Sequence, residues 1–437
     1  MDRALFKTLA EWKKKDHRKP VVLKGARQVG KSFLVRQAGA GFRNLVEVNF
    51  DFRKDLKKIF MRDLDPARIT RELCLALNTE ISEGETLLFL DEIQECPEAI
   101  KSLRYFYEKM PRLHVIAAGS LVDFVLEQTG LPVGRVMPLH LYPLSFMEFL
   151  EACDESGLVT AVTSHDPEHP MPDFIHDRLN HLLSEYMATG GMPEAVDTWI
   201  KRRDLKEVIE IQRTLIETYR QDFARYAKTI QVKYVDVVYS GIPGSLGKKL
   251  VFSSFGPDYR ARELRPALEL LSKAQVAHRV VHSSCGTVPL AGQSNPAYFK
   301  VIMCDVGLVQ AMLSMDVSRW ILDGDELLAG AGPVAENFIG QEILACGPAT
   351  ERIQLHYWAR QKRGASAEVD YVVERKGRIL PVEVKSGNSN RVKSLKMLME
   401  SKPHIRKGIV FSKNNFSKER GISRYPLYAV SLIYGRT

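Results

Sequence analysis

Residues 25–32 read Gly-Ala-Arg-Gln-Val-Gly-Lys-Ser, which matches G-x-x-x-x-G-K-S at every fixed position. This pattern is typical of the phosphate-binding P-loop. Its two glycines let the backbone curl so that successive N–H groups point at phosphates. Lys31 places a positive charge on the β- and γ-phosphates, and the Ser32 hydroxyl can hold Mg²⁺. We therefore predict an ATP site built from Gly25, Ala26, Arg27, Gln28, Val29, Gly30, Lys31, Ser32 and Phe33.

The sequence on either side of this loop has the expected order of elements. Residues 21–23 form a short apolar run that reads as a buried strand, and residues 33–37 open a helix. The N-terminus of such a helix faces the phosphates and favours their negative charge. Strand, loop and helix together make a chance match to a glycine-containing turn a poor explanation.

A second motif bears on hydrolysis. Residues 86–92 read Thr-Leu-Leu-Phe-Leu-Asp-Glu, an apolar strand ending in two acids, which is the usual form of a Walker B strand. We assign Asp91 to Mg²⁺. Glu92 is the candidate general base, because a carboxylate at that position can polarise the attacking water. The alternative is an edge strand that ends in a solvated acidic turn.

Two further residues are candidates for contact with the nucleotide. Residues 114–120 form another buried strand that ends at Ser120, and ligands bind outside the carboxyl ends of strands in such sheets. Ser120 is therefore expected to sense the γ-phosphate or the water. Arg135 follows Gly134 in a loop and is a candidate arginine finger for its own or a neighbouring subunit, against the plainer reading as a surface arginine.

The order of these motifs resembles that of a bacterial and archaeal family of AAA-type ATPases with a C-terminal domain of unknown function, DUF4143. The resemblance is carried by the P-loop and by Leu-Asp-Glu-Ile-Gln-Glu-Cys-Pro at 90–97, Ala-Gly-Ser at 118–120, Gly-Arg-Val at 134–136 and Tyr-Pro-Leu-Ser-Phe-Met-Glu-Phe at 142–149. Later pieces at 190–193, 305–308 and 336–387 extend it over nearly the whole chain. It implies an α/β fold with an AAA+ core, a helical lid, a winged-helix segment and a C-terminal nuclease-like domain.

We place the predicted domain boundaries at residues 1–140 for the P-loop AAA+ core, 141–230 for the lid, 231–325 for the winged-helix-like segment and 326–437 for the DUF4143 domain. Helical periodicity over 172–188 and 206–227 supports the lid, whereas the polar, proline-containing stretch 154–173 is expected to be a loop. Near the end of the second helix stand Arg220, Asp222 and Arg225, which either relay the nucleotide state or form a solvated face.

The segment after residue 230 has winged-helix form: a helix from Val232, a turn at 242–247, a helix at 260–274 and a strand at 276–282. It holds eight Lys and Arg against four Asp and Glu between 231 and 282. We expect Arg260, Arg262 and Lys273 to contact DNA phosphates. Winged helices also dock proteins, and the charge also fits an ordinary solvated face.

A second constellation lies at 368–385, where two predicted strands flank the tight turn Lys376-Gly377-Arg378. Side chains repeat every two residues along a strand, so Glu383 and Lys385 share a face that Asp370 can meet from the partner strand. The pattern resembles the PD-(D/E)xK nuclease, or restriction-endonuclease-like, fold. That resemblance implies an Mg²⁺ site at Asp370 and Glu383, with Lys385 catalytic and Glu336 from a preceding helix as a further ligand (Glu342 second). The alternative is a salt-bridged hairpin without activity.

Composition limits the remaining choices. The chain has 437 residues and a formal charge of +9, so two to four globular domains are expected and nucleic acid is a compatible partner. It contains no apolar run of eighteen residues and its first twenty residues lack an apolar signal region, so we expect no membrane span and no secretion. Six cysteines without C-x-x-C spacing favour reduced thiols in the cytoplasm.

We therefore predict an ATP-hydrolysing AAA+ protein, using ATP and Mg²⁺, that couples its nucleotide cycle to DNA binding or cleavage. Two alternatives stay open: an ATP-gated switch whose inactive nuclease-like domain binds a protein partner, and a P-loop kinase acting on a small molecule. The paired acids at 91 and 92 speak against the kinase, because a kinase does not need a base aimed at water.

Overall fold

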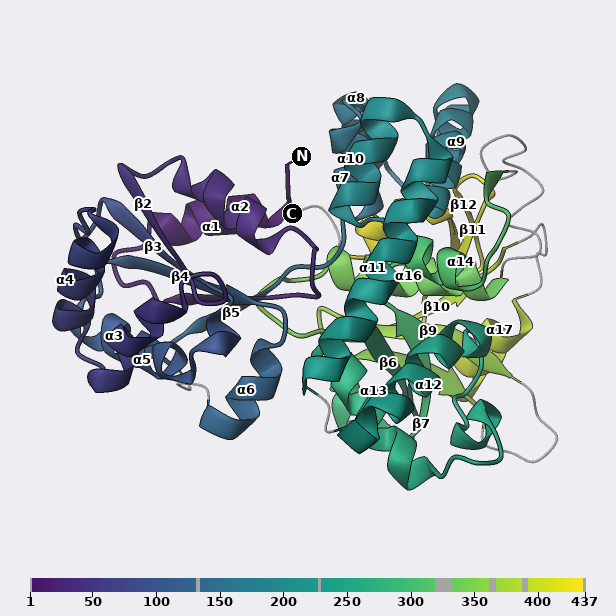
Figure 1. Cartoon of the computed structure of the whole chain (residues 1–437). Helices are drawn as coiled ribbons and strands as arrows, with labels where there is room; N and C mark the ends of the chain where they lie inside the picture. Colours follow the sequence, from purple (N-terminus) through teal and green to yellow (C-terminus); the bar gives the residue numbers. More distant parts are fainter. Residues whose placement is uncertain are drawn as a thin grey trace. The chain divides into compact units, whose positions relative to one another are not determined.

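The structure is a computed structural model that describes residues 2–130, 134–226, 229–318, 332–360, 367–386 and 392–434. The chain forms two compact units, Met1–Tyr142 with Pro348–Arg352 and Pro143–Gly347 with Ile353–Thr437. The short segment 348–352 belongs to the first unit, where the Ala349 carbonyl accepts a hydrogen bond from the His140 N–H at 2.9 Å. Figure 1 labels the elements of both.

The first unit is a parallel five-stranded sheet with helices on its faces. Its strands run in the order β2-β3-β4-β1-β5, so β4 lies between β1 and β3. Every residue of β3 and β4 is buried, as expected for strands covered on both faces. The elements are β1 (Val21–Lys24), β2 (Asn44–Asn49), β3 (Thr86–Asp91), β4 (His114–Gly119), β5 (Met137–His140), α1 (Leu5–Lys13), α2 (Lys31–Gly39), α3 (Lys57–Arg62), α4 (Pro66–Leu77), α5 (Pro97–Lys109) and α6 (Val122–Thr129), with 3₁₀ turns η1 (Lys54–Leu56) and η2 (Ile93–Glu95).

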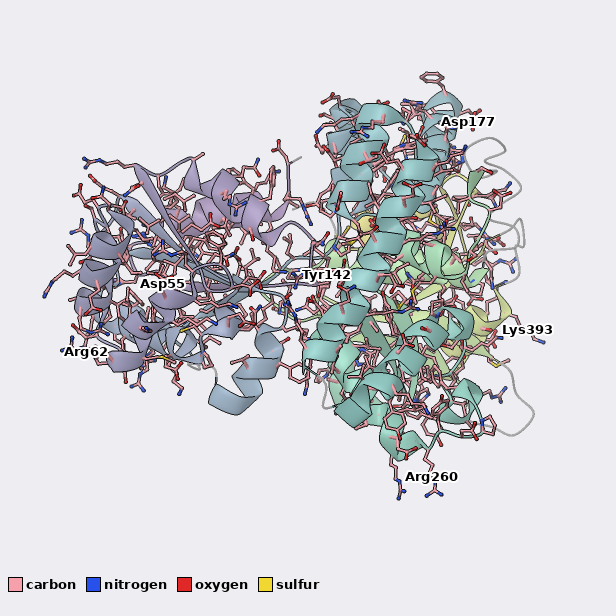
Figure 2. The ribbon with its side chains drawn as sticks, in the orientation of Figure 1. Asp55, Arg62, Tyr142, Asp177, Arg260 and Lys393 are labelled. Atoms are coloured by element: carbon pink, nitrogen blue, oxygen red, sulfur yellow. The ribbon has the colours of Figure 1, made fainter. Side chains whose placement is uncertain are left out.

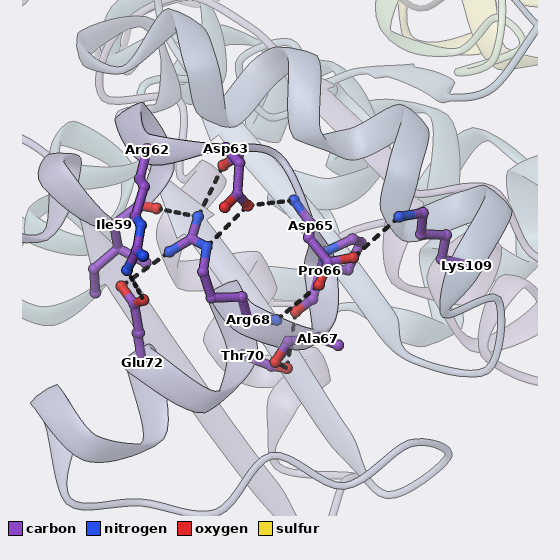
Figure 3. Close-up of polar contacts among 10 residues, drawn as sticks. All are labelled: Ile59, Arg62, Asp63, Asp65, Pro66, Ala67, Arg68, Thr70, Glu72 and Lys109. Carbon is purple, nitrogen blue, oxygen red and sulfur yellow. Dashed lines mark hydrogen bonds and ion pairs between the residues drawn. The ribbon is translucent and has the colours of Figure 1, made fainter.

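A polar network fixes the corner between α3 and α4 (Figure 3). The Asp65 carboxylate caps α4 by accepting from the Arg68 N–H at 3.3 Å. The Arg68 guanidinium pairs with Asp63 at 2.8 Å and with Glu72 at 2.9 Å, and Lys109 reaches Asp65 at 3.0 Å. An Asp at the N-cap satisfies backbone donors that the first helical turn leaves unpaired. The network acts together with apolar packing, since Phe60 on α3 and Ile69 and Leu73 on α4 are buried in the same core.

The second unit combines a helical part with a mixed sheet. The sheet has eight strands in the order β12-β13-β11-β10-β9-β8-β6-β7. Its strands are β6 (Ala277–Ser283), β7 (Ser294–Met303), β8 (Leu355–Ala359), β9 (Glu368–Arg375), β10 (Arg378–Val384), β11 (Gly408–Ser412), β12 (Ser417–Glu419) and β13 (Ile422–Pro426). Its helices are α7 (Phe146–Ala152), α8 (Ser156–Ser164), α9 (Asp173–Thr189), α10 (Pro193–Arg202), α11 (Leu205–Tyr226), α12 (Thr229–Ser245), α13 (Ala261–Lys273), α14 (Val306–Met312), α16 (Gly332–Ala345) and α17 (Lys393–Ser401), with 3₁₀ turns η3 (Phe252–Phe255), η4 (Leu290–Gln293) and η5 (Leu427–Ile433).

The segment predicted to be a winged helix shares its sheet with the C-terminal part of the chain. Helices α12 and α13 precede the antiparallel pair β6–β7, and β6 also pairs in parallel with β8. Residues 277–303 and 355–359 therefore contribute to one sheet. The domain boundaries drawn from the sequence stay a prediction.

Three local expectations differ from the structure. Residues 156–164 form α8, because the prolines that suggested a loop begin only at Pro167. The turn expected at 242–247 begins later, since α12 continues through Pro243 to Ser245. Residues 427–433 are an apolar run for which the sequence also predicts a strand, but they form the 3₁₀ turn η5, most of whose apolar residues are buried; a short apolar run does not by itself distinguish a strand from a helical turn.

Candidate functional site

The P-loop joins β1 to α2 at the carboxyl edge of the first sheet. Two of its residues take left-handed backbone angles, Gln28 with φ 62° and Gly30 with φ 94°. Gly25 is needed for a different reason, because a Cβ there would lie 2.3 Å from the Leu141 carbonyl oxygen. The Lys31 ammonium lies inside the loop and donates to the carbonyls of Gly25 at 3.0 Å and Ala26 at 2.8 Å. The loop curls around the Lys31 ammonium and Phe33 is exposed beside it; that the loop holds phosphates stays a prediction.

The Walker B strand meets the loop at one point. The Ser32 hydroxyl donates to Asp91 Oδ2 at 2.9 Å, and Asn49 Nδ2 at the end of β2 donates to the same oxygen at 3.2 Å. Burial raises the pKa of Asp91, and the hydrogen bond from Ser32 opposes that rise. A hydroxyl and a carboxylate in contact are the hard oxygen ligands that Mg²⁺ prefers, so these residues fit the metal that accompanies ATP.

Glu92 follows Asp91 in a left-handed conformation, with φ 49°. Its Oε2 accepts a hydrogen bond from Gln94 Nε2 at 2.5 Å. Gln94 is in turn enclosed by the end of β4, since a Cβ on Gly119 would lie 2.1 Å from Gln94 Oε1. Gln94 therefore orients the candidate base. We did not predict this role, although the residue lies in the quoted stretch 90–97.

The strand order brings Ser120 to the same edge. Because β4 lies between β1 and β3, its carboxyl end stands between the P-loop and Walker B strands. Ser120, the residue after β4, is 7% exposed. This is the place expected for a side chain that senses the γ-phosphate, which stays a prediction.

Arg135 lies at the amino ends of the strands, opposite to the carboxyl ends where the P-loop lies. β1 and β5 are parallel with Val21 opposite Met137, so Arg135 precedes the amino end of β5 whereas the P-loop follows the carboxyl end of β1. Its guanidinium pairs with Glu108 at 3.0 Å and lies over the ring of Tyr107. The structure does not bring Arg135 to the nucleotide site of its own subunit. Action on a neighbouring subunit stays a prediction.

The second constellation comes together around β9 and β10. Lys385 Nζ pairs with Glu383 Oε1 at 2.6 Å, and Asp370 Oδ2 accepts from the Val384 N–H at 2.8 Å. Burial raises the pKa of Glu383, while Lys385 opposes the rise. Glu336 lies on α16, where the Tyr371 hydroxyl donates to its backbone carbonyl at 2.7 Å. All four predicted residues thus lie around one end of the β9–β10 hairpin.

Sequence reasoning missed the residue at the centre of this cluster. The Lys300 side chain, on β7, is 1% exposed; its ammonium pairs with Glu336 Oε1 at 2.8 Å, with Glu368 and, at 3.7 Å, with Asp370 Oδ1. Burial alone would lower the pKa of Lys300, but the three carboxylates outweigh it and hold the pKa above its usual range. Burial and the charge of Asp370 raise the pKa of Glu336 against the opposing effect of Lys300. We call Lys300, Glu336, Glu368 and Asp370 the lysine-centred cluster.

Family models match three stretches of the chain. The model of the AAA domain matches residues 17–150, a domain of unknown function (DUF8612) matches 180–319, and a second one (DUF4143) matches 331–430. The chain carries an AAA domain and a C-terminal DUF4143 domain. The P-loop and Walker B residues fall inside the AAA match, and α16 with strands β8 to β13 falls inside the DUF4143 match.

Three solved structures illustrate what this chain is similar to. A Walker-type ATPase of Pyrococcus abyssi is 17% identical with a TM-score of 0.45, over 71% of this chain and 95% of that one. PCH-2 of C. elegans is 11% identical with a TM-score of 0.29, over 46% and 62%. A STAND signal-transduction ATPase of Pyrococcus horikoshii with a tetratricopeptide repeat sensor is 12% identical with a TM-score of 0.28, over 79% and 45%. No curated protein matches the chain. Within the described ranges, no helix has the length and apolar character that a membrane span requires.

Glu342, the second metal candidate on α16, lies apart from the lysine-centred cluster. Its two carboxylate oxygens accept from the Phe146 N–H at 3.0 and 3.2 Å, at the start of α7. It therefore caps a helix instead of joining Asp370. Complete burial raises the pKa of Glu342 to about 8.

This burial predicts a pH dependence of stability. The folded-state pKa of Glu342 lies above the value of about 4.3 for a free Glu, so between these values the folded chain binds a proton that the unfolded chain has lost. The free energy of unfolding should then fall as pH rises through this window, by at most about 1.4 kcal/mol per pH unit for this group. Glu342→Gln stays neutral, keeps an oxygen for the Phe146 N–H and should flatten the fall. Denaturant unfolding at pH 5.5 and 8.5 measures this fall in the free energy of unfolding, and Glu400→Gln, at an exposed position, is the matched control. If the free energy of unfolding falls as much with pH in Glu342→Gln as in the native chain, Glu342 is not the group responsible.

Proposed function

We propose that the AAA domain hydrolyses ATP. The contact of Ser32 with Asp91, followed directly by Glu92, carries the proposal. In this scheme Lys31 and the loop N–H groups bind the phosphates, and Ser32 and Asp91 hold Mg²⁺, which when bound neutralises phosphate charge. Glu92 accepts the proton of the attacking water, oriented by Gln94. ATP consumption by the purified chain without any added acceptor tests this against the kinase reading.

We further propose that the nucleotide cycle is coupled to DNA binding at a basic and aromatic surface on α12, η3, α13 and β7. Three of its cations lie over aromatic rings: Lys249 over Tyr298 at 3.7 Å, Lys233 over Tyr259 at 5.4 Å and Arg265 over Phe252 at 5.9 Å. The same surface holds the predicted phosphate contacts Arg260 and Arg262, both exposed, and the half-buried Lys273; Figure 2 labels Arg260 where it projects from the start of α13.

The composition of this surface favours nucleic acid over a plain solvated face. Lys233, Lys248, Lys249 and Arg265 form no ion pair with any residue in the described ranges, so their charges are available to phosphates. In single-stranded DNA, the backbone phosphates suit such cations and the bases suit an accessible aromatic ring beside them. Tyr298, 39% exposed, is the ring most open to a base.

The expected result for this surface is a loss of DNA affinity in Lys248→Ala/Lys249→Ala. Removing two phosphate contacts should weaken binding about tenfold and lower the salt slope by about 1.5. Fluorescence anisotropy with single-stranded, duplex and branched DNA, with ATP or ADP, measures both quantities. Lys206→Ala/Lys396→Ala removes the same charge from exposed positions elsewhere in the second unit and should bind normally. Equal binding by the two double variants would contradict the assignment.

A second candidate function is the ATP-gated switch whose C-terminal domain binds a protein partner without cleaving DNA. The position of Lys300 among three carboxylates favours it over a nuclease. ATP turnover with neither DNA affinity nor cleavage would select this function over the DNA proposal.

A further inference from the structure

The fold that the D…E-x-K pattern resembles uses a divalent cation, and the residues of the DUF4143 domain do not fit one. A divalent cation needs carboxylate oxygens that converge on open space. Here the three nearest carboxylates converge on the Lys300 ammonium. Among the residues that the structure describes, no group of three or more His, Cys, Asp or Glu side chains could hold a metal ion.

The fold holds Lys300 in this position. It stands on β7, which pairs with β6 and places Lys300 opposite Val280. Its side chain is 1% exposed, and its ammonium lies 5.3 Å from the centre of the Tyr357 ring on β8. A metal ion at this place would have to displace the Lys300 ammonium from its carboxylates. If the displaced ammonium did not reach water, it would be a buried, unpaired charge, which is strongly unfavourable. Lys300 therefore cannot easily make room for a second cation.

Among the remaining oxygens of the described residues, Glu383 Oε2 is buried without a hydrogen-bond partner, and a single carboxylate oxygen does not make a metal site. Asp370 Oδ2 accepts from the Val384 N–H, and Glu383 Oε1 is held by Lys385. Glu336, Glu368, Asp370 and Glu383 carry four negative charges when ionised, against two positive charges from Lys300 and Lys385. Without Lys300, three carboxylates would face one another with no cation between them, which is the arrangement that binds a divalent metal.

We propose that the Lys300 ammonium takes the place of the divalent cation in the DUF4143 domain, so that these carboxylates bind no metal in the native chain and the domain does not cleave phosphodiesters. The lysine-centred cluster then joins β7, β9 and α16 as a structural element. This inference concerns the second unit alone, since Lys300 lies in the stretch 180–319 and its carboxylate partners lie in the DUF4143 match, and it does not depend on ATP hydrolysis or on DNA binding.

Titration with MnCl₂ in the absence of nucleotide tests the proposal. Calorimetry would compare the native chain, Asp370→Asn, Lys300→Met and the double variant Lys300→Met/Asp370→Asn. Met keeps the length of the Lys stem and removes its charge. We expect the native chain and Asp370→Asn to be indistinguishable, and Lys300→Met to gain one saturable Mn²⁺ site that the double variant loses. The gained site should bind about tenfold or more tighter than the residual binding of the native chain, because a repelling charge at contact distance is gone.

Two results would overturn the proposal. One is a Mn²⁺ site in the native chain that Asp370→Asn abolishes, or nicking of supercoiled DNA with MnCl₂ that the same variant abolishes. The comparison of the native chain with Asp370→Asn can be made even if Lys300→Met fails to fold. If Asp370→Asn itself is unstable, Glu336→Gln takes its place. The other is a folded Lys300→Met variant that gains no site. ATP turnover is measured on the same Lys300→Met sample. If it is unchanged, the missing Mn²⁺ site counts against this proposal and not against ATP hydrolysis by the AAA domain.

Discussion

Glu92→Gln is expected to lower ATP turnover by about 10²- to 10⁴-fold while leaving ATP binding intact. The amide has nearly the same shape as the carboxylate and can keep the contact with Gln94, but it cannot accept a proton from water. Ser32, Asp91 and Lys31, which bind the nucleotide in the proposed scheme, are untouched by the change. Steady-state phosphate release gives turnover, and equilibrium titration with a fluorescent ATP analogue gives the dissociation constant.

The matched control is Glu83→Gln, an exposed glutamate in the turn before β3 that should turn over ATP at the native rate. Native turnover in Glu92→Gln would remove Glu92 from the catalytic role. A simultaneous loss of binding would instead mean that the substitution disturbed Asp91, whose Oδ1 accepts from the Glu92 N–H at 3.1 Å.

The ATP site could be predicted from sequence because its main residues are neighbours in the chain. The P-loop supplies its cradle within eight residues, and the Walker B acids follow one apolar strand. Asn49 and Gln94 could not be predicted in the same way. Asn49 reaches Asp91 only because β2 pairs with β3, and the role of Gln94 depends on its packing against the end of β4. Arg135 was a candidate that the structure does not bring to the site of its own subunit. Its place in a loop could not reveal whether that loop lies at the amino or the carboxyl ends of the strands.

Lys300 could not be found from local sequence for a physical reason. It stands in Tyr-Phe-Lys-Val-Ile, where a lysine in an apolar strand reads as the outward-facing side chain of an edge strand. Its actual burial depends on three carboxylates from α16 and β9, whose residues follow 36 to 70 positions later in the chain. Asp370, Glu383 and Lys385 were predictable as a group, because the tight turn at Lys376-Gly377 fixes the register of their hairpin. Pairing between distant strands is the information that a single sequence lacks.

Lys31→Ala is expected to weaken ATP binding by at least about 10²-fold and to abolish measurable turnover. The Lys31 ammonium is buried against two loop carbonyls, so it already lies where phosphate oxygens enter the cradle. Removing it takes away the ammonium that the motif places on the β- and γ-phosphates, which the neutral N–H groups of the loop and the positive end of the α2 dipole do not replace.

Equilibrium titration with ATP, with and without Mg²⁺, measures the effect of Lys31→Ala. Lys54→Ala, an exposed lysine in η1, changes the net charge equally and should bind as the native chain does. Without nucleotide, the variant gives the reference melting temperature against which the effect of ATP is measured. It should lose the rise in melting temperature that ATP gives the native chain, since a ligand stabilises only the fold it binds. Retained stabilisation by ATP would show that the nucleotide binds without this loop and would refute the assignment of the site.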